Sequence, residues 1–208
     1  FSEFTKLDTI ALSTVATRAL LARYGFAHRD VDAIIWGGVI LPSASPNVAR
    51  EIALDLKFDP RAEGYTVTRA CASGLQAVTL AAAQIERGES DIMIAGGSDS
   101  TSNAEVKLAQ QMVHAFAPLA FGKPKATDYL AAFRKLGPVS ELVPKRPEIA
   151  ERTTGEVMGE SAERMATHWE ITREAQDAFA LASHQRAAAA IASGRFANEI
   201  TEVEIEGG

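Results

Sequence analysis

Three short apolar runs, separated by segments of helical periodicity, constrain this chain more than any other feature. The first run, residues 31–40 (VDAIIWGGVI), holds apolar and β-branched side chains almost without interruption. An unbroken run of this kind is typical of a strand in a sheet that is covered on both faces. Residues 65–69 and 91–95 predict two further strands. Helices that alternate with such strands predict an α/β layer with parallel pairing.

Three helices are predicted around these strands. Apolar side chains repeat at helical spacing over residues 7–24, and Gly25 follows as a left-handed stop. Residues 47–57 predict a second helix, with Asn47 as its N-cap. The Ala-rich residues 75–87 predict the third helix, because alanine has the highest helix propensity.

The second half of the chain has a different pattern. Five of the eight prolines lie between Pro118 and Pro147, where no strand periodicity is visible. We expect an irregular surface segment there, with at most a short helix over residues 128–135. Two clear helices are predicted further along the chain, over residues 159–170 and 173–193.

Composition excludes several classes of function. The chain has 208 residues, enough for one large domain or two modest ones. Its net charge of −6 argues against a nucleic-acid-binding protein, since phosphate contacts need surplus Lys and Arg. A single cysteine excludes a disulfide framework, and the four histidines lack the spacing of a metal site. Neither a membrane-spanning stretch nor a signal peptide is recognisable, so we expect an intracellular protein.

Cys71 is the candidate nucleophile. It follows the strand at 65–69 and precedes the helix at 75–87, so we expect it at a sharp strand-to-helix turn. Free backbone N–H groups and the positive end of the helix dipole favour a thiolate there and can hold a developing oxyanion. Ser73 and Gly74 keep the turn small, which lets a carbonyl group approach closely. The alternative is that Cys71 is a buried and unreactive core residue.

The surroundings of Cys71 resemble a known family. Residues 67–78 (VTRACASGLQAV) resemble the active-site signature of the thiolases, and residues 88–97 (GESDIMIAGG) are similar to the family's next strand and glycine pair. Three later segments resemble the middle of the family's chain in the same order: residues 158–163 (MGESAE), 171–177 (ITREAQD) and 183–187 (SHQRA). The middle segment as a whole is most similar to the thiolase subunit of fatty-acid β-oxidation multienzyme complexes.

This resemblance implies the layered αβαβα fold of the thiolases, of which the chain would hold an incomplete part. An N-terminal half-domain without its first strand would be followed by an inserted loop domain, helical and irregular, and by a strand that returns to the core. The corresponding ranges are 1–100, 101–198 and 199–208. The alternating polarity of residues 200–205 (ITEVEI) also predicts a strand there.

The resemblance further implies a reaction. Thiolases, which are acetyl-CoA C-acyltransferases, cleave 3-ketoacyl-CoA with free CoA or condense two acyl-CoA molecules in the reverse direction. Cys71 would carry the acyl group as a thioester, because a thiolate is both a strong nucleophile and a competent leaving group. Met158, in the family's Met-Gly motif, would line the acyl or pantetheine pocket. CoA is then a substrate, and we expect neither a cofactor nor a metal.

The resemblance also implies partners and a location. Family members are dimers or tetramers, so we expect a homo-oligomer that binds acyl-CoA and CoA. Similarity to the multienzyme complexes implies a hydratase/dehydrogenase partner subunit. The expected location is the cytoplasm, or the mitochondrial matrix in a eukaryote.

Departures from the family leave two other functions open. The family's Asn-Glu-Ala-Phe segment, its Gly-His-Pro segment and its second Cys motif do not occur in this sequence. We therefore expect these residues to belong to a longer polypeptide or to need another chain, and the chain alone to be inactive. A ketoacyl-synthase-type condensing enzyme, which shares a Cys at such a turn, is one alternative. A catalytically silent half-domain that binds acyl-CoA or a partner is the other.

Two local differences from the family accompany these absences. Val157 stands where several thiolases carry a His, and residues 98–102 (SDSTS) replace the usual Glu and Met.

One basic segment gives a separate hint about the ligand. Residues 123–152 hold seven Lys or Arg and four acidic residues, a net charge of +3 against −9 for the remainder. Such a segment suits the phosphates of CoA, although a solvated loop explains it equally well. Its mixture of apolar and basic side chains also suits a partner subunit or a membrane surface.

Overall fold

The computed structural model describes residues 3–105, 108–136, 138 and 150–205. The chain divides into two compact units, one of Phe1–Glu105 with Thr201–Gly208 and one of Val106–Ile200. We describe each unit by itself. Their identification as a thiolase half-domain and its loop domain stays a prediction.

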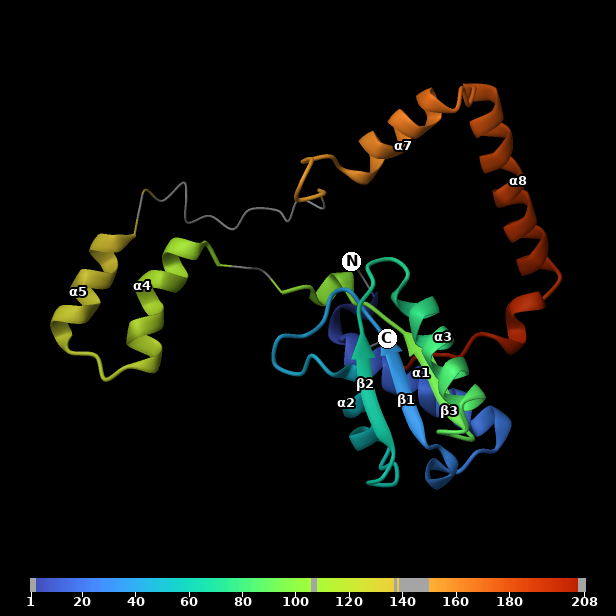
Figure 1. Cartoon of the computed structure of the whole chain (residues 1–208), viewed down its shortest axis with the longest axis horizontal. Helices are drawn as coiled ribbons and strands as arrows, with labels where there is room; N and C mark the ends of the chain where they lie inside the picture. Colours follow the sequence, from blue (N-terminus) through green and yellow to red (C-terminus); the bar gives the residue numbers. More distant parts are fainter. Residues whose placement is uncertain (1–2, 106–107, 137, 139–149, 206–208) are drawn as a thin grey trace. The chain divides into compact units, whose positions relative to one another are not determined.

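The first unit is an α/β layer, as the sequence predicts (Figure 1). Its helices and strands are α1 (Thr9–Tyr24), β1 (Ala33–Gly37), α2 (Val48–Asp55), β2 (Glu63–Val67), α3 (Ser73–Glu86) and β3 (Met93–Gly97). Short 3₁₀ turns lie at η1 (Glu3–Lys6), η2 (His28–Asp30) and η3 (Thr101–Asn103).

The three strands form one parallel sheet in the order β2-β1-β3. All five residues of β1 are buried, which explains its unbroken apolar run. The register aligns Gly37 at the end of β1 with Val67 in β2 and Gly97 in β3. The carboxyl ends of the strands therefore meet in one row at the same edge of the sheet.

Helices cover both faces of this sheet. Ile34 and Trp36 of β1 pack with apolar residues of α1 and α2 on one face. Ile35 lies on the other face and packs with Ala77 and Ala81 of α3. The alternation of side chains along a strand thus separates two hydrophobic clusters on the two sides of β1.

Two predicted helix ends are confirmed in this unit, whereas α2 ends two residues before the expected residue 57 and α3 begins two residues before the expected residue 75. Gly25 has a φ of 70° and closes α1 in the left-handed conformation, which glycine adopts without strain. The Asn47 side chain caps α2 by accepting the backbone N–H of Arg50. Asp8 caps α1 in the same way through the N–H of Ala11, a cap that the sequence analysis did not identify.

The second unit is helical in the residues that the structure describes. Its elements are α4 (Gln110–Phe121), α5 (Ala126–Lys135), α7 (Met158–His168), α8 (Arg173–Ala192) and η4 (Arg195–Asn198). The predicted helices at 159–170 and 173–193 are confirmed as α7 and α8. Thr172 caps α8 through the N–H of Ala175.

The expected irregular segment between Pro118 and Pro147 is wrong for part of its length. Pro118 lies inside α4, where no helix was expected. The short helix expected over residues 128–135 is confirmed as part of α5. The two helices pack together through Phe116 and Phe133, whose rings meet edge to face at 6.1 Å. This ring pair helps to hold α4 against α5, although Pro118 lies in the last turn of α4. Residues 139–149, which also belong to this prediction, lie outside the described residues.

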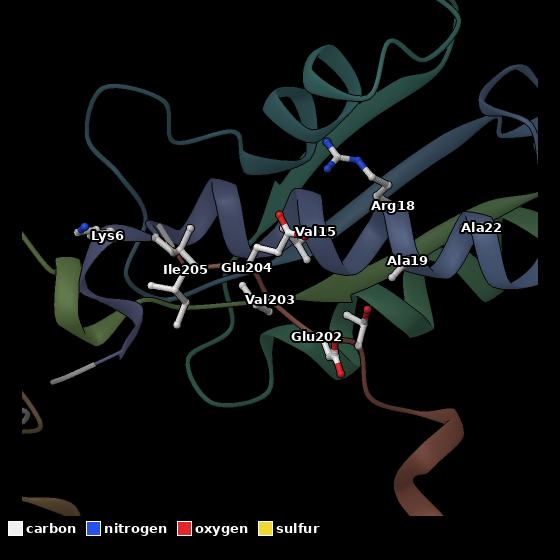
Figure 2. Close-up of a pocket in the computed structure, with 11 residues that line it drawn as sticks. Lys6, Val15, Arg18, Ala19, Ala22, Glu202, Val203, Glu204 and Ile205 are labelled. Carbon is white, nitrogen blue, oxygen red and sulfur yellow. The ribbon is translucent and has the colours of Figure 1, made fainter. Parts of the chain in front are cut away.

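The expected strand at 200–205 is also wrong. Residues 201–205 have no strand pairing and line a groove along α1 together with Val15 and Ala19 (Figure 2). The described part of this segment lies against the helix and not beside β2 or β3, the two edges of the sheet. Alternating polarity indicates a segment with one buried side. Here Val203 and Ile205 are the half-buried side chains, and they face the groove along α1 instead of a sheet.

Glycines bring α3 very close to the sheet at the row of strand ends. A Cβ atom on Gly37 would lie 2.5 Å from the carbonyl carbon and oxygen of Ser73. A Cβ on Gly97 would lie 2.8 Å from the Gly37 oxygen. Only residues without a side chain fit here, so the first turn of α3 is seated directly on the ends of β1 and β3.

Gly37→Ala is expected to lower the free energy of unfolding by about 1–3 kcal/mol, because the added methyl group must displace backbone atoms. Urea unfolding followed by circular dichroism measures this effect. Gly74→Ala is the matched control, since a Cβ there would meet no atom within 4 Å. Equal destabilisation by both substitutions would contradict the close seating of α3.

Asp32 joins the starts of β1 and β3, at the amino ends of the strands. Its carboxylate accepts the backbone N–H groups of Asp91 at 2.7 Å and Ile92 at 3.0 Å. The N–H groups of Ile92 and Asp91 hold the pKa of Asp32 below its ordinary value. The ionised carboxylate is therefore favoured more in the folded state than in the unfolded state.

Asp32→Asn is expected to lower the melting temperature at neutral pH, because the charge-assisted hydrogen bonds are lost. The stabilisation is complete above the unfolded pKa of about 4 and disappears as the pH falls through the lower, folded pKa. Melting curves between pH 7 and strongly acidic pH should therefore converge for the two proteins. Asp91→Asn keeps the backbone N–H that Asp32 accepts and removes only a neighbouring side-chain charge, so it should leave the pH dependence of the parent chain intact.

Candidate functional site

Cys71 lies at the strand-to-helix turn that the sequence predicts. It is placed between the end of β2 at Val67 and the start of α3 at Ser73. Its side chain is exposed, so the alternative of a buried and unreactive core residue is wrong. The catalytic role of the thiol stays a prediction.

A hollow of about 300 Å³ includes Cys71 in its wall. Three chain segments line it, namely the end of β1, the turn before α3 and the end of β3: residues Gly37, Gly38, Val39, Ala70, Cys71, Ser73, Gly74, Gly97, Ser98 and Asp99. Most of the wall is backbone or small side chain. The hollow therefore offers backbone groups and one thiol to whatever enters it.

The topology explains why a hollow forms at this place. The chain leaves β1 toward α2 on one face of the sheet and leaves β2 toward α3 on the other. The strand order reverses between β1 and β3, whose ends line the hollow, and such a switch point opens a crevice at the carboxyl ends of the strands. In α/β sheets this crevice is where ligands bind.

The backbone just before the thiol is strained. Ala70 has a φ of 46°, in the left-handed region that residues with a Cβ rarely adopt. Such a residue costs of the order of 1–3 kcal/mol and persists only where its surroundings determine it. Two backbone hydrogen bonds, from Ala72 to Arg69 and from Ser73 to Ala70, hold the turn at 3.1 Å each.

The Ser73 hydroxyl adds two further bonds to this turn. Its oxygen accepts the backbone N–H of Arg69 at 2.8 Å and donates to the carbonyl oxygen of Ala70 at 2.7 Å. Ser73 is 4% exposed, although it lies two residues from the exposed thiol. On the surface of the same turn, the Arg69 guanidinium donates to Gln76 Oε1 at 2.6 Å.

The N-terminus of α3 supplies free donors. Among the described residues, no acceptor takes the backbone N–H of Gly74 or of Leu75, which belong to the first turn of the helix. The first N–H groups of a helix carry its positive end and attract negative charge. An anion held near Cys71 would meet these groups and the positive end of α3.

Asp99 builds the opposite wall of the hollow. Its Oδ1 accepts the N–H of Val39 at 2.8 Å and the N–H of Ile40 at 2.6 Å. One carboxylate oxygen therefore folds the loop that follows β1 toward the end of β3. In the sequence, residues 98–102 stood out only as a departure from the family, and this role of Asp99 was missed. An acidic side chain two residues after a strand end was the signal that could have found it.

Ser98 connects the same wall to α1. Its hydroxyl lies 2.6 Å from the Ser13 hydroxyl and accepts the indole N–H of Trp36 at 3.0 Å. Ser13 is fully buried and also donates to the carbonyl oxygen of Thr9. This network fixes the end of β3 against a helix on the far face of the sheet, and its polar atoms are all paired.

Glu105 secures the loop further from the thiol. Its Oε1 accepts both the backbone N–H of Ser43 at 2.9 Å and the Ser43 hydroxyl at 2.8 Å. The backbone N–H and the hydroxyl of Ser43 lower the pKa of the Glu105 carboxyl. The loop after β1 is thus held by two carboxylates, Asp99 and Glu105.

The remaining predicted site features lie in the second unit. Met158 is the first residue of α7 and is 72% exposed, and its part in an acyl pocket stays a prediction. The basic segment is described only in part, since Lys145 and Arg146 lie outside the described residues. Arg134 and Lys135 close α5, where cations stabilise the carboxyl end of a helix.

The described residues form neither a metal site nor a membrane-spanning helix. No group of three or more His, Cys, Asp or Glu side chains is placed so that it could hold a metal ion. Within the same part of the chain, no helix combines the length and hydrophobicity needed to cross a membrane.

Comparison with known proteins gives a consistent result. The family profile "Thiolase, N-terminal domain" matches residues 2–208. The 3-ketoacyl-CoA thiolase of Shewanella halifaxensis is 34% identical over 206 residues, which are 97% of this chain and 46% of that protein. The 3-ketoacyl-CoA thiolase of Shewanella amazonensis is 36% identical over 197 residues, 95% of this chain and 45% of that protein.

Solved structures agree with these relatives. The acetyl-CoA acetyltransferase of Bacillus anthracis matches with a TM-score of 0.76 and 29% identity, over 99% of this chain and 47% of that one. The Acat5 thiolase of Ascaris suum, solved in complex with coenzyme A, matches with a TM-score of 0.76 and 25% identity, over 97% and 48% of the two chains. The chain spans about half the length of these proteins, and it belongs to the thiolase family as that family's N-terminal domain.

Proposed function

We propose that this chain carries the nucleophilic half of a thiolase, with Cys71 as the residue that accepts and releases the acyl group. The observation that supports this most directly is an exposed thiol in the wall of a hollow at the carboxyl ends of the strands. Membership of the thiolase family and the 3-ketoacyl-CoA thiolases among its relatives supply the substrate class, a 3-ketoacyl-CoA.

The proposed reaction has two steps. The Cys71 thiol loses its proton, its sulfur attacks the C3 carbonyl carbon and the C2–C3 bond breaks. The electron pair of that bond leaves with the acetyl-CoA fragment, which takes up the proton that the thiol lost. A thioester then links the shortened acyl group to Cys71. The sulfur of free CoA attacks this thioester, the bond to Cys71 breaks, and the CoA thiol proton is transferred to the released thiolate. Sulfur suits both steps, because it is a strong nucleophile and a good leaving group.

The start of α3 supports the charge that develops in each step. Attack on a carbonyl creates an oxyanion, and unpaired N–H groups in a fixed position stabilise such an anion without reorganisation. Gly74 lines the hollow, its N–H meets no acceptor in the part of the chain that the structure describes, and the space where its Cβ would stand is open. A substrate carbonyl can therefore come close to the backbone at this position.

Proton transfer is proposed to depend on residues of another segment. The acetyl-CoA fragment must be protonated, and the sequence motifs with which the family does this do not occur in these residues. The proposal for the chain alone is therefore acyl transfer to and from Cys71, without sustained cleavage of a carbon–carbon bond. Met158 is proposed to line the pocket for the acyl or pantetheine chain.

CoA is proposed as a substrate, and no cofactor is invoked. A complex solved with coenzyme A exists for the Ascaris suum thiolase. We also propose a homo-oligomer, a hydratase/dehydrogenase partner subunit and a cytoplasmic location. Each of these follows from the family and not from a contact in the structure.

Incubation with acetyl-CoA is expected to place one acetyl group on the chain, because the thioester exchange needs only the thiol and the oxyanion donors. Mass spectrometry of the intact chain and of its peptides measures the adduct and assigns it to Cys71. Added CoA should remove the acetyl group, since the exchange is reversible. Cys71→Ser should show no exchangeable adduct, because the leaving group is lost.

The same experiment separates the alternatives. A silent half-domain predicts that acetyl-CoA leaves Cys71 unmodified while the thiol still reacts with iodoacetamide, and this result would overturn the proposal. A condensing synthase predicts an acyl-enzyme that forms from acyl thioesters but resists release by CoA. Adding acetoacetyl-CoA and CoA to the chain alone should give no sustained thiolysis, and turnover there would refute the dependence on another segment.

A further inference from the structure

We infer that Ser73 is a positioning residue, whose buried hydroxyl holds the Cys71 turn in the geometry needed for acyl transfer. This inference rests on the proposed function, because it assigns Ser73 a part in the reaction of Cys71. It adds a residue to the site that neither the fold nor the comparisons assign.

The hydroxyl joins the end of the strand to the start of the helix. It accepts from Arg69 N–H on the strand side of the thiol and donates to Ala70 carbonyl oxygen in the turn itself. Both bonds are short and well paired, and the side chain is 4% exposed, so water does not replace them easily. Cys71 therefore lies in the chain between Arg69 and Ala70, which the hydroxyl binds, and Ser73, which carries the hydroxyl.

These two bonds maintain a backbone conformation that is otherwise unfavourable. Ala70 has a φ of 46°, and residues with a Cβ adopt this region only when neighbouring contacts hold them there. The carbonyl oxygen of Ala70 receives two donors, the Ser73 N–H and the Ser73 hydroxyl. Loss of the hydroxyl leaves only the two backbone hydrogen bonds of the turn, at 3.1 Å each, to oppose the strain.

The position of Ser73 is itself fixed by the sheet. Its carbonyl group approaches Gly37 so closely that no Cβ fits there. The hydrogen bonds of Ser73 (the Ser73 clamp) therefore fix the position of the Cys71 thiol relative to the ends of the strands, and not relative to a mobile loop. Displacement of a nucleophile by about 1 Å costs roughly 100-fold in rate when the substrate must be oriented.

A small reagent does not depend on this orientation in the same way. Iodoacetamide reacts with any exposed thiol that it can reach, whereas acetyl-CoA must present its carbonyl to the sulfur and to the oxyanion donors together. The ratio of the two rates therefore reports geometry at Cys71 when each variant is folded at the assay temperature. This ratio distinguishes a positioning role from a merely structural one.

The test compares the parent chain with Ser73→Ala, Ser73→Thr and Gln76→Ala, all checked for melting temperature. Ser73→Ala should slow acetylation of Cys71 by roughly 10- to 100-fold and iodoacetamide labelling by less than about threefold. Ser73→Thr keeps the hydroxyl and should restore most of the acetylation rate. Gln76→Ala removes the surface contact to Arg69 on the same turn and should behave like the parent chain.

Hydrogen exchange gives a second readout that does not depend on the Thr variant. The Arg69 amide should be protected in the parent chain and exchange faster in Ser73→Ala, while amides within α3 keep their protection. An unprotected Arg69 amide in the parent chain would overturn the inference.

The outcomes separate this inference from the proposed function. Failure of the parent chain to accept an acetyl group overturns the proposed function and removes the basis for the clamp. Acetylation of the parent chain together with an unchanged rate in Ser73→Ala overturns the inference alone. Equal slowing of acetylation and iodoacetamide labelling, or a folded Ser73→Thr that stays slow, also overturns it.

Discussion

The contact between the first turn of α3 and the end of β1 is the constraint on which the site depends. Gly37 and Gly97 have no side chain at the row of strand ends, so the backbone of Ser73 and Gly74 is seated directly on the sheet. A helix that starts this close to the strands places its free N–H groups at the crevice where the connections diverge. The position of the thiol then follows from the backbone and requires no long side chain to reach the site.

The sequence predicts the α/β layer well because its signals are local. An unbroken apolar run, an Asn before a helix and a Gly after one each act within a few residues, and β1, α2 and the end of α1 appear where expected. The failures come from contacts that sequence does not reveal. α4 packs on α5 although it contains Pro118, and residues 201–205 lie on α1 although their alternation suits a strand.

The site shows the same division between local and distant information. Cys71 was predictable, because its segment resembles a family signature and lies between a strand and a helix pattern. The role of Ser73 could be inferred only from the φ of Ala70 and the hydrogen bond to Arg69. A pattern of residue types contains neither. Asp99 and Ser98 required the register of the sheet, because Asp99 binds the loop after β1 and Ser98 binds Trp36 within β1, each about 60 residues earlier in the chain.

A backbone-lined hollow suits a reaction in which one atom must both accept and release a group. Side chains that contacted the acyl group tightly would stabilise the thioester as much as the transition state and slow its release. N–H groups at a helix start favour the oxyanion, which exists only during attack and collapse, and add little to the thioester itself. Rigidity of the turn is then the main requirement, because a backbone N–H group that must reorient as water does would stabilise the oxyanion no better than water. The chain meets this requirement with glycine contacts on the sheet side and with carboxylate-anchored loops on the opposite wall.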